Sequence, residues 1–308
     1  MSGPRWSIRP ATRADAAAVH EVSRAAFAGQ DTLDPPSGVF GESADDVADR
    51  LDEHGGLLAV DAAGEVVGAL RFREGDGRVW LRRVAVRPDV GGRGIGSSLV
   101  AAGEREAGRR GYRAVHIGVR SPLEDNIRYW RRRGYVPVAD HDFWVELVRR
   151  LAYVEVPTVE DMQALGRRLS SVLRAGDLVL LSGDLGAGKT ALTQGIGEGL
   201  GVRGAVTSPT FVIARVHPSL RDGPPLVHVD AYRLGTLAEV DDLDLDATLE
   251  ESVTVVEWGG GIAEGLAEDR LEVVVTRATD PADDTRTVTL AATGSRWSDV
   301  DLDSLTRA

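Results

Sequence analysis

The spacing of apolar residues along the first half of the chain switches repeatedly between helical and extended periods. A period near 3.6 predicts amphipathic helices over residues 13–27 and 44–53. Short apolar runs bounded by turn residues predict strands over residues 6–9, 57–60, 66–72 and 79–86. Two of these strands flank Ala62-Ala63-Gly64 and form a predicted hairpin. The alternation of helices and strands indicates an α/β fold.

The second half continues this alternation after Arg150, with strands that are more apolar. Thr158 is placed as the N-cap of a helix that runs to Arg174, and a further helix is predicted over residues 190–200. Strands are predicted over residues 154–156, 177–182, 211–216, 225–230 and 253–257. Almost wholly apolar runs of this kind are typical of strands buried on both faces of an α/β sheet.

Length and composition place the chain among ordinary globular proteins. Its 308 residues favour two domains, which the change of pattern assigns to residues 1–150 and 151–308. The hydrophobic content of 43%, with 27% charged residues, is sufficient for a substantial core. The absence of cysteine excludes disulfides, thiolate zinc sites and cysteine nucleophiles. The sequence contains no signal-peptide pattern and no apolar run of membrane-spanning length, so we expect a cytoplasmic protein without a membrane partner.

Charge is distributed unevenly between the two halves. Residues 1–150 contain 23 arginines against 22 acidic residues, whereas residues 151–308 contain 13 basic residues against 26 acidic ones. The net charges are therefore +1 and −13. Since affinity for nucleic acid comes mainly from basic residues that neutralise phosphates, the second half is poorly suited to bind a nucleic-acid backbone by itself. Any role in RNA chemistry is expected to run through a protein partner.

The single lysine of the chain, Lys189, lies in a glycine-rich segment, although the other 35 basic residues are all arginine. Residues 183–190 fit the P-loop pattern G-x-x-x-x-G-K-[ST] between a predicted strand and a predicted helix. In such loops backbone N–H groups enclose phosphate oxygens, and the lysine reaches a slot that is too narrow for a planar guanidinium. The predicted nucleotide-binding residues are Gly183, Asp184, Gly186, Ala187, Gly188, Lys189, Thr190 and Ala191.

Two predicted strands of the second half end in carboxylates, Asp230 and Glu257. If these strands run parallel to the strand before the P-loop, both acids lie at the carboxyl edge of the sheet, where ligands bind. We expect Asp230 to bind Mg²⁺ through water, and Glu257 to be a second ligand or a base that orients water. The alternative is that each acid caps a following helix. The predicted catalytic residues are Lys189, Asp230 and Glu257, and the predicted metal ligands are Thr190, Asp230 and Glu257.

Two threonines are further candidates for contacts with the nucleotide. Thr210 follows Pro209 in Ser-Pro-Thr and is placed to sense a γ-phosphate, with an ordinary turn at the start of a strand as the alternative. Thr158 is either a helix cap alone or a cap whose hydroxyl also approaches the nucleotide. The sequence leaves both alternatives open.

A second glycine-rich loop follows the last predicted strand of the first half and opens a helix. Gly94 and Gly96 fill the two small positions of a Q/R-x-x-G-x-G/A signature, while Gly91 stands where that signature has Gln or Arg. Residues 125–135 are similar to an N-x-x-x-Y-x-x-x-G-[FY] region. In this order and spacing, the motifs resemble those of the GNAT acetyltransferases over about residues 5–148.

This resemblance implies a GNAT-like, strongly bent mixed sheet with flanking helices, and acetyl-CoA bound where two strands splay apart. The implied acetyl-CoA contacts are Val84, Val86, Gly92, Gly94, Gly96, Ser97 and Asn126. The tyrosine that many relatives use as general acid is replaced by Trp130, and on a helix its neighbour Tyr129 points about 100° away. The candidate general bases, for each of which a surface or capping role is the alternative, are Glu74, Glu124, His116 and His141. The sequence does not specify the amine acceptor.

The motifs of the second half occur in one order: the P-loop, then Ser-Pro-Thr-Phe (208–211), His-Val-Asp-Ala-Tyr-Arg-Leu (228–234) and Val-Glu-Trp (256–258). With this set, about residues 152–292 resemble the TsaE family of bacterial ATPases. The resemblance implies a P-loop NTPase-like α/β sandwich that binds ATP and Mg²⁺. It also implies a role in the synthesis of tRNA threonylcarbamoyladenosine (t6A37) with TsaD-like and TsaB-like partners. The protein is expected to act on tRNA only indirectly, through these partners. The metal and nucleotide roles of the family fall on Thr190, Asp230 and Glu257, with Thr210 in the switch-like position.

The sequence therefore predicts a GNAT-like N-acetyltransferase domain fused to a TsaE-like ATPase domain. An alternative for the second half is a small-molecule P-loop kinase, which requires an acceptor pocket and an arginine-bearing lid. No lid-like insertion is visible, although arginines are available at Arg203, Arg215, Arg221 and Arg233. An alternative for the first half is a CoA-binding or docking module without catalysis, which Trp130 favours.

Overall fold

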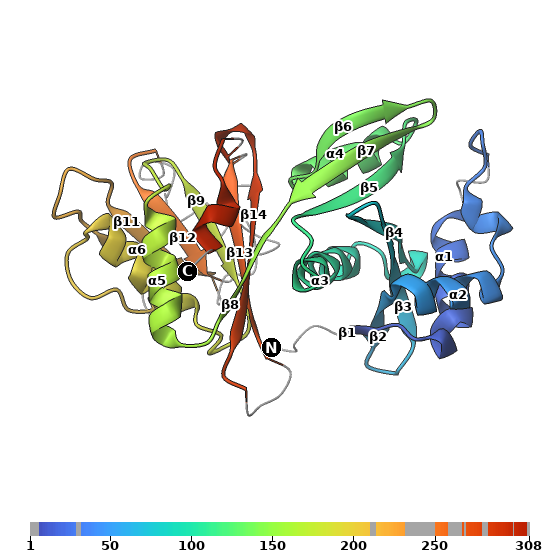
Figure 1. Cartoon of the computed structure of the whole chain (residues 1–308), viewed down its shortest axis with the longest axis horizontal. Helices are drawn as coiled ribbons and strands as arrows, with labels where there is room; N and C mark the ends of the chain where they lie inside the picture. Colours follow the sequence, from blue (N-terminus) through green and yellow to red (C-terminus); the bar gives the residue numbers. More distant parts are fainter. Residues whose placement is uncertain are drawn as a thin grey trace. The chain divides into compact units, whose positions relative to one another are not determined.

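The computed structural model describes residues 6–28, 32–209, 214–231, 250–257, 267, 269–278, 283–297 and 299–306. Contacts between Cα atoms divide the chain into two compact units (Figure 1). The N-terminal unit comprises Met1–Arg131 and Tyr135–Arg150, and the C-terminal unit comprises Arg132–Gly134 and Leu151–Ala308. Each unit contains a sheet with seven strands among the described residues.

The sheet of the N-terminal unit is mixed. Its strands are β1 (Trp6–Pro10), β2 (Gly56–Asp61), β3 (Val66–Gly75), β4 (Arg78–Val86), β5 (Ala114–Arg120), β6 (Val136–His141) and β7 (Trp144–Arg150). They follow the order β1-β2-β3-β4-β5-β7-β6, with antiparallel neighbours except for the parallel pair β4 and β5. Although both of these strands are described over their whole length, they pair only at Val79–Val115 and Trp80–His116. The sheet therefore opens between β4 and β5.

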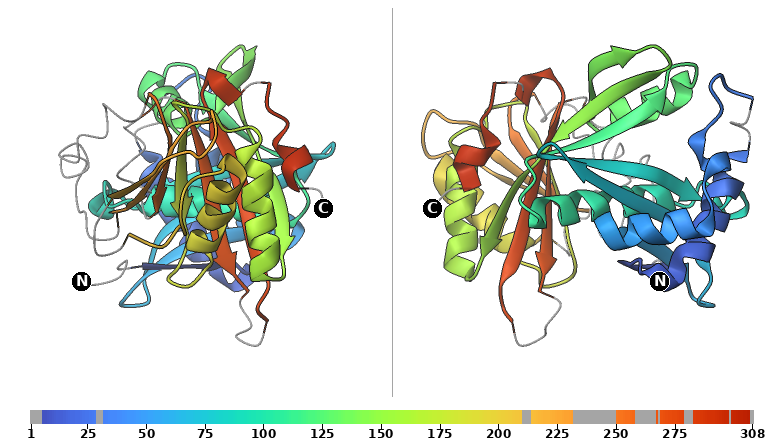
Figure 2. Two further views of the ribbon diagram at one scale, coloured as in Figure 1. Left: turned by 90° about the vertical axis from the view of Figure 1, so that its left-hand side faces the viewer. Right: turned by 45° about the vertical axis from the view of Figure 1, so that its right-hand side comes forward.

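Helices cover both faces of this sheet. They are α1 (Ala16–Ala26), α2 (Ala44–His54), α3 (Ile95–Arg109) and α4 (Glu124–Arg132). α1 and α2 lie side by side (Figures 1 and 2), and their apolar residues pack on Leu58, Ala69 and Ala85. Leu70, the next residue of β3, lies against Gly103 of α3. Because successive residues of a strand point to opposite faces, α1 and α2 cover one face and α3 covers the other.

The sheet of the C-terminal unit has a parallel centre and antiparallel edges. Its strands are β8 (Ala152–Val156), β9 (Leu178–Ser182), β10 (Ala214–His217), β11 (Leu226–Asp230), β12 (Val253–Glu257), β13 (Arg270–Arg277) and β14 (Arg286–Thr293). The order is β10-β11-β12-β9-β13-β14-β8, in which β11, β12, β9 and β13 are parallel. The strands that end at Asp230 and Glu257 are thus parallel to the strand before the P-loop, the condition on which their predicted roles depend.

Two helices of the C-terminal unit, α5 (Val159–Ser170) and α6 (Lys189–Leu200), lie side by side on one face of its sheet (Figure 1). Their buried side chains, among them Leu165, Leu192 and Ile196, belong to the same apolar cluster as residues of β9, β12 and β13. A short helix, α9 (Leu302–Thr306), adds to this cluster. No helix in the described part of the chain is both long and apolar enough to cross a membrane.

The structure corrects two predicted helices. The first three residues of the helix predicted over residues 13–27 form a separate 3-10 turn, and α1 begins at Ala16. The cause is the Asp15 carboxylate, which accepts hydrogen bonds from the N–H and the hydroxyl of Thr12. α5 ends at Ser170 and not four residues later, because the hydroxyls of Ser170 and Ser171 donate to backbone carbonyl oxygens three residues earlier. Such local bonds compete with the helical hydrogen bonds.

The apolar pattern did not locate β5, β6, β7, β13 and β14. β13 shows the reason, because its buried Val273 and Val275 alternate with the partly exposed Glu272 and Thr276. Short alternating segments of this kind carry a weaker signal than wholly apolar runs. β10 comprises Ala214–His217, whereas residues 211–213 of the strand predicted there lie outside the described residues.

α5 and α6 contact each other backbone to backbone at Gly195. A Cβ atom added to Gly195 would lie 2.1 Å from the carbonyl oxygen of Gln163 on α5. On the other helix, a Cβ atom added to Gly166 would lie 2.3 Å from the carbonyl oxygen of Leu192. Since α6 begins at the P-loop lysine, this close approach holds the start of α6 in place.

We expect Gly195→Ala to lower the free energy of unfolding of the C-terminal unit by about 1–3 kcal/mol, because the added methyl group forces the two helices apart. In a helix without such a contact, the same change would stabilise by up to about 1 kcal/mol. Denaturant unfolding of the full chain measures the effect. Gly223→Ala is the control, since a Cβ atom there meets no atom closer than 3.7 Å. Equal stability of the two variants would contradict the packing argument.

Candidate functional sites

The loop between β9 and α6 passes close to the neighbouring strand β13. Gly183 has φ +146°, and an added Cβ atom would lie 2.2 Å from the carbonyl oxygen of Val275. Gly188, with φ +111°, is the N-cap of α6, and the N–H of Ala187 donates to the carbonyl oxygen of Asp184 at 3.1 Å. The loop is therefore a compact turn that leads into the N-terminus of a helix, where backbone N–H groups favour anions.

The side chain of Lys189 is buried in this loop, with 4% of the residue exposed. Its Nζ donates to the carbonyl oxygens of Gly183 at 2.8 Å and Asp184 at 3.0 Å. Burial lowers the pKa of the ammonium group below its ordinary value, although the negative charges of Glu257, Asp230 and Asp184 act in the opposite direction. Lys189 thus holds its amine against the backbone of the loop, beside the two acids that end β11 and β12.

Three residues predicted as metal ligands come together at the carboxyl edge of the sheet. Asp230 is directly opposite Glu257 in the parallel register of β11 and β12. Both residues are buried, with 5% and 3% of their surfaces exposed. Thr190, the second residue of α6, donates its hydroxyl to Glu257 Oε1 at 3.2 Å. The pairing of the strands and the start of α6 therefore place one hydroxyl and two carboxylates in the same region.

His228 is a member of this group that the sequence analysis did not single out. Its Nε2 lies 2.9 Å from Glu257 Oε1, and its side chain is fully buried. His228 precedes Asp230 by two residues on β11, so both side chains point to the same face. The His-x-Asp spacing at the end of an apolar strand was the available signal. This contact fixes the orientation of the Glu257 carboxylate.

The donor atoms at this edge suit a hard cation. Mg²⁺ binds hydroxyl and carboxylate oxygens, keeps several waters and takes further oxygens from substrate phosphates. Within the described ranges, no three or more His, Cys, Asp and Glu side chains are grouped so as to hold a metal ion. Thr190, Asp230 and Glu257 therefore fit a Mg²⁺ ion that is shared with nucleotide phosphate and water, rather than one held by protein alone.

The structure gives Thr158 a capping role. Its hydroxyl oxygen accepts a hydrogen bond from the N–H of Asp161 at 3.1 Å, and the hydroxyl donates to the Asp161 carboxylate at 2.7 Å. Ser208, in the segment that precedes Thr210, has its hydroxyl 3.4 Å from Asp230 Oδ2. Residues of the predicted motifs that lie outside the described residues are Thr210, Phe211, Tyr232, Arg233, Leu234 and Trp258.

In the N-terminal unit, the glycine-rich loop connects β4 to α3. Gly94 is the N-cap of α3 and has φ +86°, a left-handed conformation that glycine adopts without strain. Gly92 also has a positive φ, +74°. Gly96 and Ser97 lie in the first turn of α3, where backbone N–H groups have no acceptor within the helix. This loop is therefore a second strand-to-helix turn of the kind that binds phosphate.

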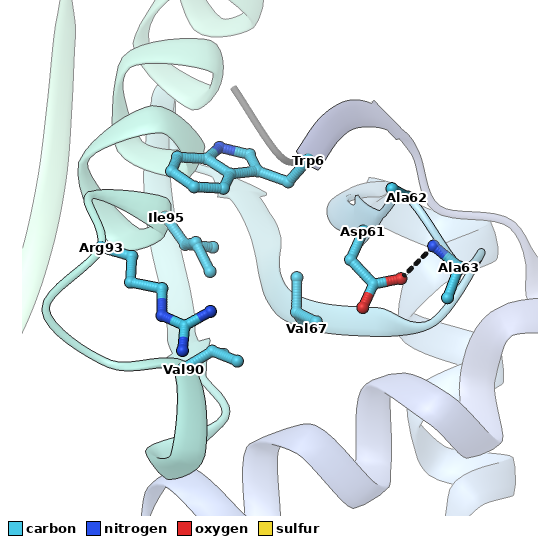
Figure 3. Close-up of a pocket in the computed structure, with 8 residues that line it drawn as sticks. All are labelled: Trp6, Asp61, Ala62, Ala63, Val67, Val90, Arg93 and Ile95. Atoms are coloured by element: carbon cyan, nitrogen blue, oxygen red, sulfur yellow. Dashed lines mark hydrogen bonds between the residues drawn. The ribbon is translucent and has the colours of Figure 1, made fainter. Parts of the chain in front are cut away.

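A small hollow of about 260 Å³ lies beside this loop (Figure 3). Figure 3 shows Arg93 of the loop and Asp61 of β2 on opposite walls, below the indole of Trp6. Asp61 accepts a hydrogen bond from the N–H of Ala63 at 2.9 Å. None of the residues predicted to contact acetyl-CoA lines the hollow, although Arg93 and Ile95, which do, flank Gly94 in the chain.

A larger cavity, of about 820 Å³, lies where β4 and β5 separate. Val84 and Val86 of β4 and Asn126 of α4, all predicted acetyl-CoA contacts, line it. At the same place β4 contains a β-bulge, because Arg83 and Val84 together stand opposite the single residue Leu70. Arg83 has φ +54° there. A bulge leaves backbone groups outside the hydrogen-bond ladder, where they are available to a ligand.

Trp130 and not Tyr129 faces this cavity. Trp130 is among the lining residues and is 9% exposed, whereas Tyr129 is 39% exposed and is not among them. The rings of the two residues pack edge to face, with centroids 5.3 Å apart. The position from which related enzymes donate a proton is thus occupied by an indole, which has no proton to give at a useful pKa.

The four candidate bases have very different surroundings. Glu74 accepts hydrogen bonds from Arg110 and Tyr112; burial raises its pKa, but these two partners outweigh burial and lower the pKa below its ordinary value. Glu124 has 82% of its side chain exposed on α4. His141 has 40% of its side chain exposed. Glu124 has the surface role that was its alternative, whereas Glu74 is engaged by Arg110 and Tyr112.

His116 is the candidate that lies at hydrogen-bond distance from the buried Glu146 carboxylate, whereas His141 Nε2 lies 3.7 Å from Glu146 Oε2. The Nδ1 atom of His116 lies 2.7 Å from Glu146 Oε1, and the side chains of His116 and Glu146 are 12% and 8% exposed. The ring of His116 also packs against Trp80, with centroids 5.1 Å apart. Gly118, two residues later on β5 and on the same face, lines the cavity. Glu146 was missed from the sequence, because its partner is 30 residues away on another strand.

Arginines gather on the sheet face that α1 and α2 cover. Arg71, 3% exposed, donates to Glu42 Oε2 at 2.7 Å, and Arg83 Nη2 lies 3.5 Å from Glu42 Oε1. Burial raises the pKa of Glu42, but attraction to Arg71 and Arg83 outweighs burial and holds the pKa below its ordinary value. Glu42 is therefore ionised and offsets part of the positive charge on this face.

We expect Glu42→Gln to destabilise the N-terminal unit by about 3 kcal/mol at neutral pH, because it leaves a buried arginine without its partner. Since the folded pKa of Glu42 is lowered from 4.5, its stabilising effect is present above that value and is lost as the pH falls through the folded pKa. The variant should therefore lose this part of the acid dependence of unfolding. Urea unfolding at several pH values tests both points. Glu65→Gln, at an exposed acid, is the control, and the same pH profile in both variants would refute the assignment.

Comparisons with known proteins agree with this geometry. The family model described as threonylcarbamoyl adenosine biosynthesis protein TsaE matches residues 156–288, and that of the acetyltransferase (GNAT) family matches residues 25–135. The chain is 67% identical over 146 residues to the tRNA threonylcarbamoyladenosine biosynthesis protein TsaE of Streptomyces coelicolor, which covers 47% of this chain and 99% of that protein. It is 41% identical over 140 residues to the protein of the same name from Bacillus subtilis, over 45% of this chain and 84% of that protein.

A solved acetyltransferase is among the structural neighbours of the chain. It is the PaiA N-acetyltransferase of Thermoplasma acidophilum in complex with coenzyme A, with 17% identity, coverage of 49% of this chain and 99% of that chain, and a TM-score of 0.43. The two matching family models occupy separate parts of the chain. The chain therefore belongs to the TsaE family through its C-terminal unit, and residues 25–135 of its N-terminal unit match the GNAT acetyltransferase family model.

Proposed function

We propose that the C-terminal unit is a Mg²⁺-dependent ATPase of tRNA t6A37 synthesis, and that the N-terminal unit transfers acetyl groups from acetyl-CoA to an amine. The observation that carries the first proposal is the meeting of Lys189, Thr190, Asp230 and Glu257 at one edge of a parallel sheet. The role in t6A37 synthesis is proposed from the Streptomyces and Bacillus relatives, which are named as tRNA threonylcarbamoyladenosine biosynthesis proteins.

The residues at this edge divide the work of hydrolysis. The N–H groups of the P-loop and Nζ of Lys189 bind phosphate oxygens, and Thr190 and Asp230 hold Mg²⁺. Bound Mg²⁺ supplies charge neutralisation on the phosphates. Glu257, oriented by its 2.9 Å contact with His228, accepts a hydrogen bond from the attacking water and aligns it. Asp184, Gly186, Ala187 and Ala191 contribute backbone contacts, and Thr158 and Thr210 extend the proposed nucleotide site.

Protein partners connect this ATPase to tRNA. The C-terminal half carries a net charge of −13, which opposes direct binding of an RNA backbone. TsaD-like and TsaB-like proteins, the partners that the family resemblance implies, are therefore the proposed route to tRNA. A P-loop kinase remains the enzyme alternative, and it differs in requiring an acceptor for phosphoryl transfer, so phosphate release without any acceptor separates the two.

The acetyltransferase proposal is supported by the opening between β4 and β5. Val84, Val86 and Asn126 line the cavity there, and the loop with Gly94 and Gly96 begins α3 just beyond β4. Acetyl transfer breaks the C–S bond of the thioester and forms a C–N bond, and the amine gives up a proton. We propose His116, oriented by Glu146, as the base for this proton; it lies two residues from Gly118, which lines the cavity, and is not itself among the lining residues.

We expect Lys189→Arg to lower the rate of ATP hydrolysis about 100-fold or more. The planar guanidinium does not fit the slot between the phosphates, and the displaced phosphates then react more slowly. Phosphate release and t6A formation are measured together with TsaD-like and TsaB-like partners, and both should fall. Glu257→Gln should bind ATP but hydrolyse it poorly. Arg167→Lys, at an exposed ion pair of α5, is the control. Near-normal turnover of Lys189→Arg would sink the geometric argument.

We expect Gly96→Glu to abolish acetyl-CoA binding while ATP binding persists, because the new carboxylate lies where the N-terminus of α3 would hold pyrophosphate. Gly96→Ala is the matched control and should still bind. A Cβ atom at this position meets no atom closer than Val86 Cγ2 at 3.5 Å, so the fold tolerates it. Isothermal calorimetry with each ligand measures both effects. If the unmodified chain gives no heat with acetyl-CoA, the proposed activity of this unit is wrong.

A further inference from the structure

The cavity between β4 and β5 has a strongly positive wall. Its lining includes Arg73, Arg82, Arg83 and Arg120, whereas no aspartate or glutamate is found among the described residues that line it. Glu42 Oε1 lies 3.5 Å from Arg83 Nη2, so Glu42 offsets the positive charge of Arg83. For Arg73, Arg82 and Arg120, no ion pair with a described carboxylate is found. The cavity therefore holds three arginines whose charge the described part of the unit does not neutralise.

Three of these arginines share the sheet face that α1 and α2 cover. Arg82 pairs with Arg71 and Trp80 pairs with Arg73, so Arg82 and Arg73 are diagonal neighbours on adjacent strands. Diagonal neighbours of this kind have Cα atoms about 7–8 Å apart, within reach of one anion for two long side chains. Arg120 points to the same face from β5, opposite Trp144. We call this group of three lining side chains the arginine wall: Arg73, Arg82 and Arg120.

The electrostatic surroundings of the arginine wall indicate unsatisfied positive charge. Burial, reinforced by repulsion from Arg83, Arg73 and Arg71, lowers the pKa of Arg82 to about 10. In Arg120, Nε and Nη2 are buried and have no hydrogen-bond partner among the described residues, although the guanidinium stacks on Phe143 at 4.9 Å. Buried guanidinium donors without acceptors are costly, and a bound carboxylate or phosphate would supply the acceptors.

The phosphates of acetyl-CoA are not suited to occupy this wall. The pyrophosphate is proposed to bind at the loop that follows Val86, the last residue of β4. Arg82 lies four residues before Val86. Arg73 is paired with Trp80, which lies six residues before Val86. At about 3.3 Å per residue, these positions are roughly 13 and 20 Å from the end of the strand. The β-bulge at Arg83 lies between these two positions and the loop, and we place the reactive thioester end of the donor there, at the opening between β4 and β5. Arg73 and Arg82 are therefore on the acceptor side of the bulge, whereas Arg120, four residues after His116, is level with Val84 and lies beside the bulge.

We propose that the acetyl acceptor is an anionic amine, that is, a primary amine that carries a carboxylate or a phosphate bound by the arginine wall. The inference rests on the proposed acetyltransferase function. The anion is held by guanidinium forks, which match carboxylate and phosphate oxygens in pairs. The amine then faces the thioester at the bulge. A cationic acceptor, such as a peptide with basic residues after its N-terminus, is repelled from the same wall.

The test compares pairs of amines, one of which carries an anionic group that the other lacks, with the full chain and acetyl-CoA. The pairs are phenylalanine against phenylalaninamide, phosphoethanolamine against ethanolamine, and tripeptides with two aspartates against the same peptides with two lysines. Release of free CoA thiol gives kcat/KM for each. One or two charge-assisted hydrogen bonds correspond to about a 10- to 100-fold preference for the anionic member. Which pair shows the largest ratio separates a carboxylate from a phosphate, and a small molecule from a peptide.

Two variants connect the preference to the wall. Arg73→Gln and Arg82→Gln should each lower the ratio of anionic to neutral kcat/KM about 10-fold, with a much smaller change for the neutral amine. Arg73 is exposed, so its variant keeps the test valid if replacement of the partly buried Arg82 prevents folding. Arg109→Gln, at an exposed ion pair on α3, removes the same charge elsewhere and should leave the ratio unchanged.

The outcomes are distinguishable. Transfer to neutral or cationic amines with equal or greater kcat/KM overturns the anionic acceptor and leaves the acetyltransferase function intact. A preference for anions that survives in both arginine variants overturns the arginine wall as its cause. Absence of acetyl-CoA binding, or binding without transfer to any amine, refutes the acetyltransferase function and this inference with it.

Discussion

The parallel pairing of β11 with β12, and of β12 with β9, is the constraint on which the C-terminal site depends. Because the three strands run in the same direction and in register, Asp230, Glu257 and the start of the P-loop reach one edge together. A slip of one residue would turn every side chain of β11 to the other face and remove both Asp230 and His228 from that edge. The contact of α5 with α6 at Gly195 then holds Lys189 and the start of α6 against it.

The N-terminal site depends on the opposite property, the failure of two strands to pair. β4 and β5 are hydrogen-bonded at only two positions of their described lengths, and the cavity lies where they separate. The bulge at Arg83 adds unpaired backbone groups at that point. Both units nevertheless contain the same local element, a glycine-rich turn from a strand into a helix, with Gly94 and Gly188 as N-caps in the left-handed region.

Charge gives the two sites their different partners. The edge that holds Lys189 is surrounded by acids, which suits a metal ion and a nucleotide that brings its own phosphates. The cavity of the N-terminal unit is lined by arginines, with Glu42 offsetting part of their charge, which suits an acceptor that brings an anion. In each site the charge of the protein groups is not fully balanced within the site, so a ligand of the opposite charge is favoured over others.

The sequence by itself determined the two-part α/β organisation, the P-loop with its single lysine, the acids that end β11 and β12, and both family resemblances. These features are local, since each depends on residues close together in the chain. Only the tertiary structure decided that His228 orients Glu257, that Glu146 lies closer to His116 than to His141, and that arginines from β3, β4 and β5 line one cavity. The physical reason is that these contacts join residues on different strands, and strand pairing, which brings them together, is not written in the spacing of any single segment.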